Sequence, residues 1–209
     1  MKNKKKKAEP FIGLAGNIGV GKTTFTKIMS VRFGWEPFYE SVSDNPYLDD
    51  FYADMKRWSF NLQIYFLHKR FKMHQQMSSL NKGVIQDRTI YEDVEIFAKN
   101  LHQLGKISNR DYENYCGLFA VMTSFLKKPN LIVYLRASTD TLISRIKTRG
   151  REYERSIDSE YLHMLNVSYD QWIGSEKEYP VLIIETDTLN VFDDLKEVEK
   201  IQKMILDRI

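Results

Sequence analysis

Eight residues near the start of the chain, from Gly16 to Thr23, have the types and spacing of a phosphate-binding loop. They read Gly-Asn-Ile-Gly-Val-Gly-Lys-Thr and fit the pattern G-x-x-x-x-G-K-[ST]. Glycines let the backbone curl so that successive N–H groups point at phosphate oxygens, and a helix that begins at the end of the loop adds the positive end of its dipole. In this pattern Lys22 reaches the β- and γ-phosphates and the Thr23 hydroxyl ligates Mg²⁺.

The loop predicts a site for ATP with its Mg²⁺ but does not identify the acceptor, because GTPases, motor ATPases and small-molecule kinases share it. We expect no other metal, since the four histidines show no spacing typical of zinc ligands. The residues predicted to bind ATP in this segment are Gly16, Asn17, Ile18, Gly19, Val20, Gly21, Lys22, Thr23 and Thr24.

Two charged elements with acceptor chemistry follow later strand-like segments. Glu40 comes after residues 36–39, and Asp87-Arg88-Thr89 comes after residues 84–86. A hydroxyl acceptor needs a carboxylate to take its proton, and a transferring phosphoryl group needs cations at its equatorial oxygens. We therefore expect Glu40 to act as the base, Arg88 and Lys22 as the cations, and Asp87 to support Mg²⁺ directly or through another ligand. From its spacing alone, Glu40 fits a solvated loop carboxylate equally well.

A third charged segment, at residues 145–155, combines four arginines and two glutamates around one glycine. It fits a mobile lid over residues 145–157 that closes Arg145, Arg149 and Arg151 over ATP. It also fits the ordinary charged end of a helix, because Arg and Lys favour helix C-termini and Gly stops helices. The neighbouring phosphate loop favours the lid, since a kinase must exclude water to avoid hydrolysing ATP.

Short apolar runs predict the strands that must position these residues. The runs lie at residues 11–15, 36–39, 84–86, 131–135 and 181–184. Predicted helices lie between them, at residues 23–32, 58–80, 91–104, 109–127, 139–148 and 158–173, and a last helix begins near Phe192. Alternation of this kind is typical of a three-layer α/β fold around a five-stranded parallel sheet. Ligands of such sheets bind outside the carboxyl ends of the strands, where the charged elements fall.

Composition favours one enzyme-sized domain over residues 10–209, preceded by a lysine-rich tail at residues 1–9. The net charge is +3, but residues 1–7 hold five lysines, and without them 26 basic residues stand against 28 acidic ones. A nearly neutral folded domain does not predict nucleic-acid binding, and we expect the lysine-rich tail to be a solvated chain end. One cysteine excludes an intrachain disulfide, and we find neither a signal peptide nor a membrane span. We expect a cytoplasmic protein.

The motifs and their order, over about residues 11–173, resemble the deoxynucleoside kinase family. The resemblance implies the P-loop kinase fold, transfer of the ATP γ-phosphate to a nucleoside 5′-hydroxyl, and Glu40 as the catalytic base. It further implies that Tyr52 and Glu154 hold the sugar 3′-hydroxyl, Gln63 pairs with the base, Arg70 and its partner Asp93 help to read the base, and Phe97 stacks on the base. Family members are commonly homodimers, and the apolar segment 115–126 could form the contact.

One departure from many animal members bears on the substrate. Those members have Glu-Pro-Val after the second strand, whereas this chain has Glu40-Ser-Val-Ser-Asp-Asn-Pro, as bacterial-type purine members do. Arg70 with Asp93 argues against the thymidine-preferring pattern. We expect deoxyadenosine as the substrate, then deoxyguanosine, then deoxycytidine.

Two alternatives stay open from the sequence. A nucleoside monophosphate kinase of the thymidylate kinase type has the same fold and a similar Asp-Arg element, but its phosphate acceptor needs no base such as Glu40. A non-catalytic P-loop nucleotide-binding module is supported only by the lysine tail.

Overall fold

The computed structural model describes residues 9–40, 44–154, 157–189 and 195–209. Its strands form one sheet in the order β2-β3-β1-β4-β5, and every neighbouring pair is parallel. The strands are β1 (Phe11–Ala15), β2 (Glu36–Phe38), β3 (Val84–Asp87), β4 (Leu131–Arg136) and β5 (Val181–Glu185). The five-stranded parallel sheet predicted from the sequence is therefore confirmed.

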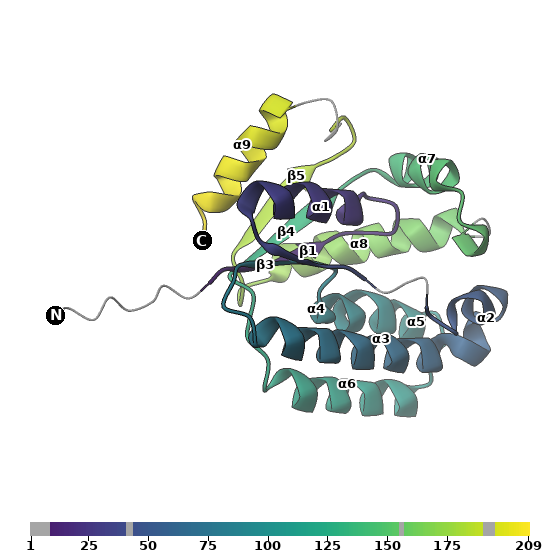
Figure 1. Ribbon diagram of the computed structural model, residues 1–209. Helices are drawn as coiled ribbons and strands as arrows, with labels where there is room; N and C mark the ends of the chain where they lie inside the picture. The colour runs from purple at the N-terminus through teal and green to yellow at the C-terminus, as the bar shows by residue number, and fades with distance from the viewer. Residues whose placement is uncertain (1–8, 41–43, 155–156, 190–194) are drawn as a thin grey trace.

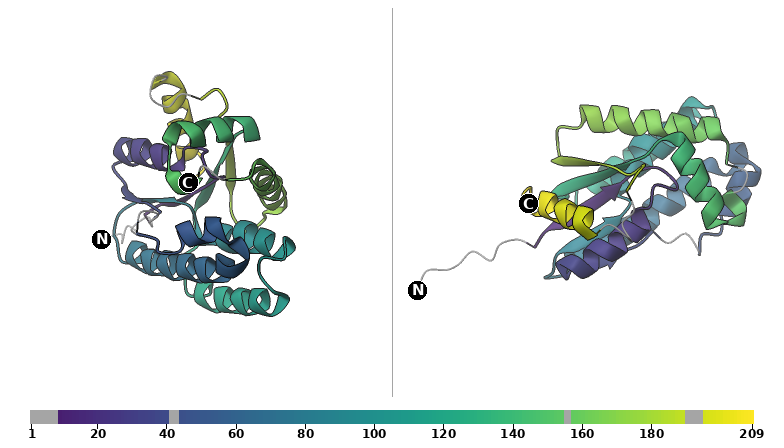
Figure 2. Two further views of the ribbon diagram at one scale, coloured as in Figure 1. Left: turned by 90° about the vertical axis from the view of Figure 1, so that its right-hand side faces the viewer. Right: turned by 90° about the horizontal axis from the view of Figure 1, so that it is seen from above.

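Helices cover both faces of this sheet. Figure 1 and the left view of Figure 2 place α1 and α9 on one side and α3 and α6 on the other. The α-helices are α1 (Lys22–Phe33), α2 (Leu48–Ala53), α3 (Met55–Ser78), α4 (Ile90–Glu92), α5 (Lys99–Gln103), α6 (Asn109–Thr123), α7 (Thr139–Arg149), α8 (Ser159–Ser175) and α9 (Leu195–Leu206). A π-helix, η1 (Asp93–Ala98), joins α4 to α5, and a 3₁₀-helix, η2 (Glu152–Glu154), lies before α8.

The sheet is buried on both faces, as a parallel sheet requires. Along β4, Val133 belongs to the core that contains Met29 of α1 and Ile201 of α9. The next residue, Tyr134, belongs to the opposite core, which contains Tyr169 of α8. Successive strand residues thus supply the two cores in turn, and the sheet becomes the rigid middle layer of an α/β/α sandwich.

The structure corrects three predicted helices. The predicted helix 91–104 is three segments with the π-helix η1 in the middle, and α2 was not predicted because it is only six residues long. The helix α3 begins at Met55 rather than at Trp58, since the Asp54 carboxylate accepts a hydrogen bond from the Arg57 N–H and caps it. The helix α6 ends at Thr123 rather than at residue 127. The predicted start near Phe192 and the lysine-rich residues 1–8 lie outside the described residues.

The absence of a side chain at Gly13 of β1 leaves room for the turn that follows β3. A Cβ atom at Gly13 would lie 2.3 Å from the Cγ2 atom of Thr89. Thr89 is the N-cap of α4, where its side chain and that of Glu92 form a capping box. The absent side chain at Gly13 therefore allows the residue directly after Arg88 to pack against β1.

We predict that Gly13→Ala lowers the free energy of unfolding by about 1–3 kcal/mol, because the added methyl overlaps the Thr89 methyl. Adding Thr89→Ser, which keeps the capping hydroxyl and removes that methyl, restores most of the loss. Gly174→Ala is the control, since nothing lies within 4 Å of a Cβ at this helical glycine. Urea unfolding of the four proteins checks this, and an equal loss with and without Thr89→Ser would contradict it.

Candidate active site

A cavity of about 1100 Å³ opens at the carboxyl ends of the strands. Its volume exceeds that of a pocket for one small ligand and suits two ligands side by side. The lining comes from the phosphate loop, the turn after β3, the helix α3, the segment after α7 and the loop after β5. The three charged elements singled out in the sequence therefore share one cavity.

The phosphate loop has the backbone that its glycines predict. Gly16, Gly19 and Gly21 all have positive φ angles, of 149°, 86° and 101°. A Cβ at Gly16 would lie 2.7 Å from the carbonyl oxygen of Leu135, so a side chain is excluded there as well. The cavity lining begins at Ile18 and includes Lys22, Thr23 and Thr24. Gly16 and Asn17 are not among the lining residues, but their carbonyl oxygens contact Lys22, which is.

The Lys22 ammonium group is held by that first part of the loop. Its Nζ atom donates to the carbonyl oxygens of Gly16 and Asn17, at 2.8 and 3.0 Å. Burial, with the Arg88 guanidinium as the second cause, lowers the pKa of Lys22 from its ordinary 10.5 to about 8. A buried cation with a lowered pKa favours an anionic ligand, which would restore its charge.

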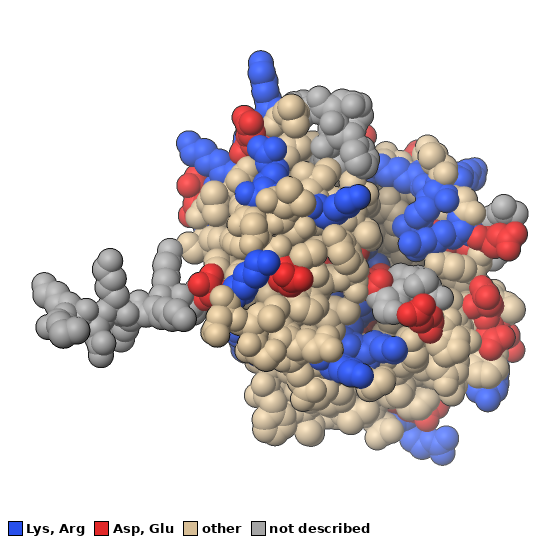
Figure 3. Space-filling model, in the orientation of Figure 1, with Lys and Arg blue, Asp and Glu red and all other residues tan. Residues whose placement is uncertain are grey.

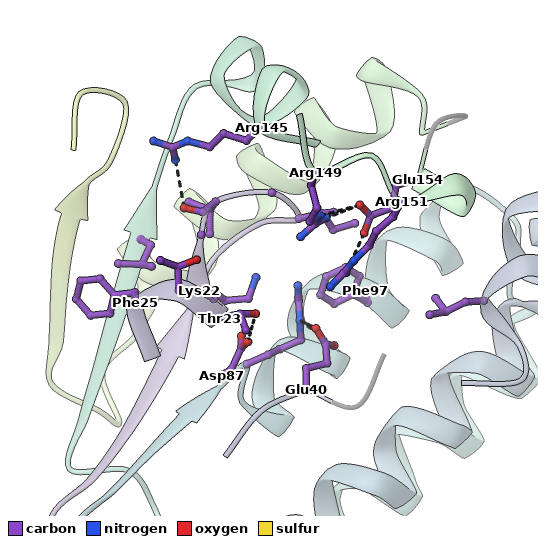
Figure 4. A pocket seen from close by; sticks show the side chains of 18 of the residues that line it. Lys22, Thr23, Phe25, Glu40, Asp87, Phe97, Arg145, Arg149, Arg151 and Glu154 are labelled. Carbon is purple, nitrogen blue, oxygen red and sulfur yellow. Dashed lines mark hydrogen bonds and ion pairs between the residues drawn. The ribbon is translucent and has the colours of Figure 1, made fainter. Parts of the chain in front are cut away.

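Thr23 and Asp87 meet where the sequence predicted support for Mg²⁺. The Thr23 hydroxyl donates to the Asp87 carboxylate at 2.5 Å (Figure 4). The other Asp87 oxygen is buried and has no hydrogen-bond partner among the residues that the structure describes. Burial raises the pKa of Asp87 even though Lys22 lies nearby. A hydroxyl beside a carboxylate with a spare oxygen is a donor set that fits Mg²⁺.

Glu40 lies between two buried arginines. Its Oε1 atom accepts from Nη2 of Arg70 at 2.8 Å, and its Oε2 atom accepts from Nε of Arg88 at 3.3 Å. Burial alone would raise the pKa of Glu40, but Arg88, Arg70 and Lys22 outweigh it and lower the pKa below the usual range. The carboxylate is thus ionised at neutral pH and able to accept a hydrogen bond from a hydroxyl.

The two arginines have further partners that fix them. The Nε atom of Arg70 donates to both oxygens of Asp93, at 2.9 and 2.6 Å. The Arg88 guanidinium lies 4.4 Å from the centre of the Phe97 ring. Burial raises the pKa of Asp93 to about 6, against the effect of Arg70. The π-helix η1 supplies both Asp93 and Phe97, and π-helical turns are frequent at functional sites.

The predicted lid residues divide into two groups. Arg149 and Arg151 both form ion pairs with Glu154, and Figure 4 shows these three side chains on the opposite side of the cavity from Glu40. Arg145 instead donates to the carbonyl oxygen of Val20 and to the Thr186 hydroxyl. Figure 3 shows Lys and Arg side chains gathered over α7, which carries Arg145 and Arg149. Arg155 and residue 156 lie outside the described residues.

The residues predicted to contact the nucleoside line the same cavity. Gln63 and Tyr52 are among them, on α3 and α2. The Gln63 Oε1 atom is buried and has no hydrogen-bond partner in the described part of the chain. Such an orphaned acceptor is costly in a folded protein, and a ligand that donates a hydrogen bond would satisfy it.

Sequence reasoning missed several residues of the cavity. Tyr153 stacks on Tyr52 with ring centres 6.0 Å apart, and Tyr161 of α8 lines the same wall. The loop from Thr186 to Leu189 also lines the cavity, and its place after the last strand was a usable signal. Asn17 was expected at ATP, but its side-chain amide donates to the carbonyl oxygen of Leu162 in α8.

Comparison with known proteins agrees with this geometry. The family model described as "Deoxynucleoside kinase" matches residues 12–209. "Deoxyadenosine/deoxycytidine kinase" of Bacillus subtilis (strain 168) is 39% identical over 196 residues, covering 93% of this chain and 90% of the relative. "Deoxyguanosine kinase" of the same organism is 38% identical over 200 residues, covering 92% and 94%. The solved "Structure of deoxyadenosine kinase from M.mycoides with bound dATP" superimposes with a TM-score of 0.82 at 33% identity, covering 95% and 100%.

This chain belongs to the deoxynucleoside kinase family, as the sequence motifs predicted. It has the P-loop kinase fold and is an ATP-dependent phosphotransferase. Among the described residues, no helix is both long and apolar enough to cross a membrane.

We predict that Lys22 makes the stability of the ligand-free protein rise with pH from about 8 to about 10.5. Between these values Lys22 is largely neutral in the folded chain and protonated in the unfolded chain. Lys22→Met removes this contribution, so the difference in unfolding free energy between variant and wild type changes by at most about 3 kcal/mol over that range. Urea unfolding at three pH values measures it. Lys27→Met, an exposed lysine of α1, is the control, and a pH-independent difference for Lys22→Met would contradict the assignment.

Proposed function

We propose that this kinase transfers the ATP γ-phosphate to the 5′-hydroxyl of deoxyadenosine, with deoxyguanosine and deoxycytidine as weaker substrates, in nucleotide salvage. The observation that carries the proposal is the position of the Glu40 carboxylate beside Arg88, in one cavity with Lys22 of the phosphate loop. A carboxylate next to cations fits an acceptor that must lose a proton while its oxygen attacks a phosphoryl group.

Each residue then has a chemical task. The Glu40 carboxylate accepts the hydrogen bond of the 5′-hydroxyl and takes its proton, and the oxygen attacks the γ-phosphate in line. Lys22 leaves the carbonyl oxygens of Gly16 and Asn17 and, with Arg88 and the lid arginines, balances the charge of the phosphoryl group. Mg²⁺, held by Thr23 and Asp87 together with the nucleotide, would neutralise phosphate charge.

The residues expected to contact the base favour binding of adenine or cytosine through its hydrogen-bonding edge. Both bases place an exocyclic amino donor beside a ring-nitrogen acceptor, which matches the paired acceptor and donor of the Gln63 amide. The orphaned Gln63 Oε1 atom would accept from the amino group. Arg70, which is ion-paired with Asp93, lines the cavity together with Gln63 and would help to read the base. Relatives named for deoxyadenosine and deoxycytidine and for deoxyguanosine are nearly equally identical to this chain, so the proposed preference for deoxyadenosine rests on the Gln63 amide and not on overall identity.

The sugar end is built from Tyr52 and Glu154. We infer that their polar groups hold the 3′-hydroxyl, for which Glu154 would exchange part of its pairing with Arg149 and Arg151. That exchange would free lid arginines for the ATP phosphates only when the nucleoside is bound. A phosphorylated acceptor, as in a nucleoside monophosphate kinase, would bring its negative charge toward Glu40, and the family match also favours a hydroxyl acceptor.

An ADP-release assay with ATP and Mg²⁺ tests the proposal on each deoxynucleoside, each ribonucleoside and dTMP separately. We expect the highest kcat/KM for deoxyadenosine and little turnover of ribonucleosides. Turnover of dTMP alone would replace the proposal with a nucleoside monophosphate kinase. Absence of turnover on all acceptors would favour a nucleotide-binding module.

We predict that Glu40→Gln lowers kcat by about 10²–10⁴-fold and leaves ATP binding nearly unchanged, because an amide cannot take the proton although its oxygen can still accept from Arg70 and Arg88. The control is Glu36→Gln at the start of β2, where the exposed carboxylate pairs with the exposed Lys82 and lies outside the cavity lining. Steady-state kinetics and ATP titration of both variants measure this. A Glu40→Gln enzyme with the wild-type kcat would exclude Glu40 as the base.

We also propose a cytoplasmic location and a homodimer that forms through α6 and the residues after it. Leu118, Val121 and Phe125 are exposed there, and the helix packs on α3 through Tyr115 and Leu67. A second copy of the chain would cover this apolar face, which lies on the layer that also builds the nucleoside end of the cavity.

We predict that Val121→Asp halves the mass measured by sedimentation velocity, because a carboxylate would be desolvated in the interface. Val121 is 63% exposed, and Val31→Asp on α1, at a valine that is 79% exposed, is the matched control. Equal masses for both variants and the wild type would exclude this face as the dimer contact.

A further inference from the structure

Tyr169 and Glu92 form a buried pair next to the cavity but outside its lining. The Tyr169 hydroxyl donates to the Glu92 Oε2 atom at 2.6 Å. The same hydroxyl accepts from Nη1 of Arg88 at 3.0 Å. One hydroxyl on α8 therefore connects a carboxylate of α4 to the arginine expected at the transferring phosphoryl group.

Glu92 fixes this hydroxyl because it is itself held from several sides. Its Oε1 atom accepts from the Thr89 N–H at 2.7 Å, and its Oε2 atom accepts from the Gly16 N–H at 3.2 Å. The residue is 0% exposed. A fully buried carboxylate with this many donors has little freedom, so it sets the position of the hydroxyl relative to the phosphate loop.

Arg88 depends on contacts with its neighbours, because its own backbone conformation is one that non-glycine residues rarely adopt. Arg88 has a φ angle of 68°, a left-handed conformation that non-glycine residues rarely adopt and that surrounding contacts must hold. Its Nε atom faces Glu40, its plane lies over Phe97, and Nη1 meets Tyr169. The Nη2 group has no hydrogen-bond partner in the part of the chain that the structure describes.

We propose that Tyr169, oriented by Glu92, is a positioning residue that sets the Arg88 guanidinium for phosphoryl transfer. This inference rests on the proposed function, since it assumes that Arg88 acts on the phosphoryl group. Tyr169 occupies the outer nitrogen Nη1, and Glu40 occupies Nε. The guanidinium is thereby turned so that Nη2 remains available for a phosphoryl oxygen. Neither Tyr169 nor Glu92 touches a substrate in this account.

Tyr169→Phe tests the inference, because it removes the hydroxyl and keeps the ring. The expected result is a kcat about tenfold lower, the effect of one hydrogen bond to a charged group, with both KM values within about twofold of wild type. Tyr134→Phe is the control. Its ring stacks on Tyr169 with centres 5.6 Å apart, but its hydroxyl donates to Asp170 instead. This control should keep the wild-type kcat, and thermal unfolding of both variants reports any loss of folding.

Arg88→Lys completes a double-mutant cycle that separates positioning from general packing. A lysine has one ammonium group and cannot donate to Glu40 and Tyr169 as the Nε and Nη1 atoms of Arg88 do. Adding Tyr169→Phe to Arg88→Lys should therefore lower kcat by less than about twofold. An unchanged kcat in Tyr169→Phe, an equal loss in Tyr134→Phe, or a full tenfold loss in the Arg88→Lys background would overturn the inference in an active enzyme. A wild-type protein without turnover on any deoxynucleoside would instead overturn the proposed function, and this inference with it.

Discussion

The Glu40 carboxylate lies between the guanidinium groups of Arg70 and Arg88, and much of the structure serves to hold these three charges in place. Charges removed from water need partners, because an unpaired buried charge costs several kcal/mol. Asp93 supplies the second anion for Arg70, and the Glu92–Tyr169 pair supplies further partners for Arg88. Because Glu40, Arg70 and Arg88 each have more than one partner, a binding nucleoside can replace one of these contacts without leaving a buried charge unpaired.

This cluster exists because the sheet order brings its members together. β3 lies between β2 and β1, so Glu40, Arg88 and the phosphate loop leave three adjacent strands at the same edge. β1 contributes residues to both cores of the sandwich, β3 contributes Ile85 to one of them, and α3 brings Arg70 and Gln63 to the same edge. The lid side chains reach the same space from α7 and η2 (Figure 4). The donor and acceptor ends of the cavity are thus placed by separate elements that share one rigid sheet.

Local signals in the sequence were sufficient for the strands and for the phosphate loop, because apolar runs and glycine spacing act over a few residues. The positions of Glu40 and Arg88 at the carboxyl ends of the strands could be predicted from the sequence, although their ion pair could not. The roles of Glu92 and Tyr169 were missed because their contacts join segments far apart in the chain. The anchoring of Arg145 on Thr186 was missed for the same reason. The π-helix η1 has no simple periodic signature, so a regular helix was predicted where Asp93 and Phe97 needed a wider turn.

A crystal structure with deoxyadenosine, Mg²⁺ and a non-hydrolysable ATP analogue would show which group lies at the 5′-hydroxyl. We expect the nucleoside 5′-oxygen within about 2.6–3.2 Å of the Glu40 carboxylate, with the Arg88 guanidinium on the γ-phosphate. A 5′-oxygen distant from Glu40, with the carboxylate still closed on both Arg70 and Arg88, would contradict it. In that case the cluster would be a structural ion-pair network and the proton acceptor would be another group.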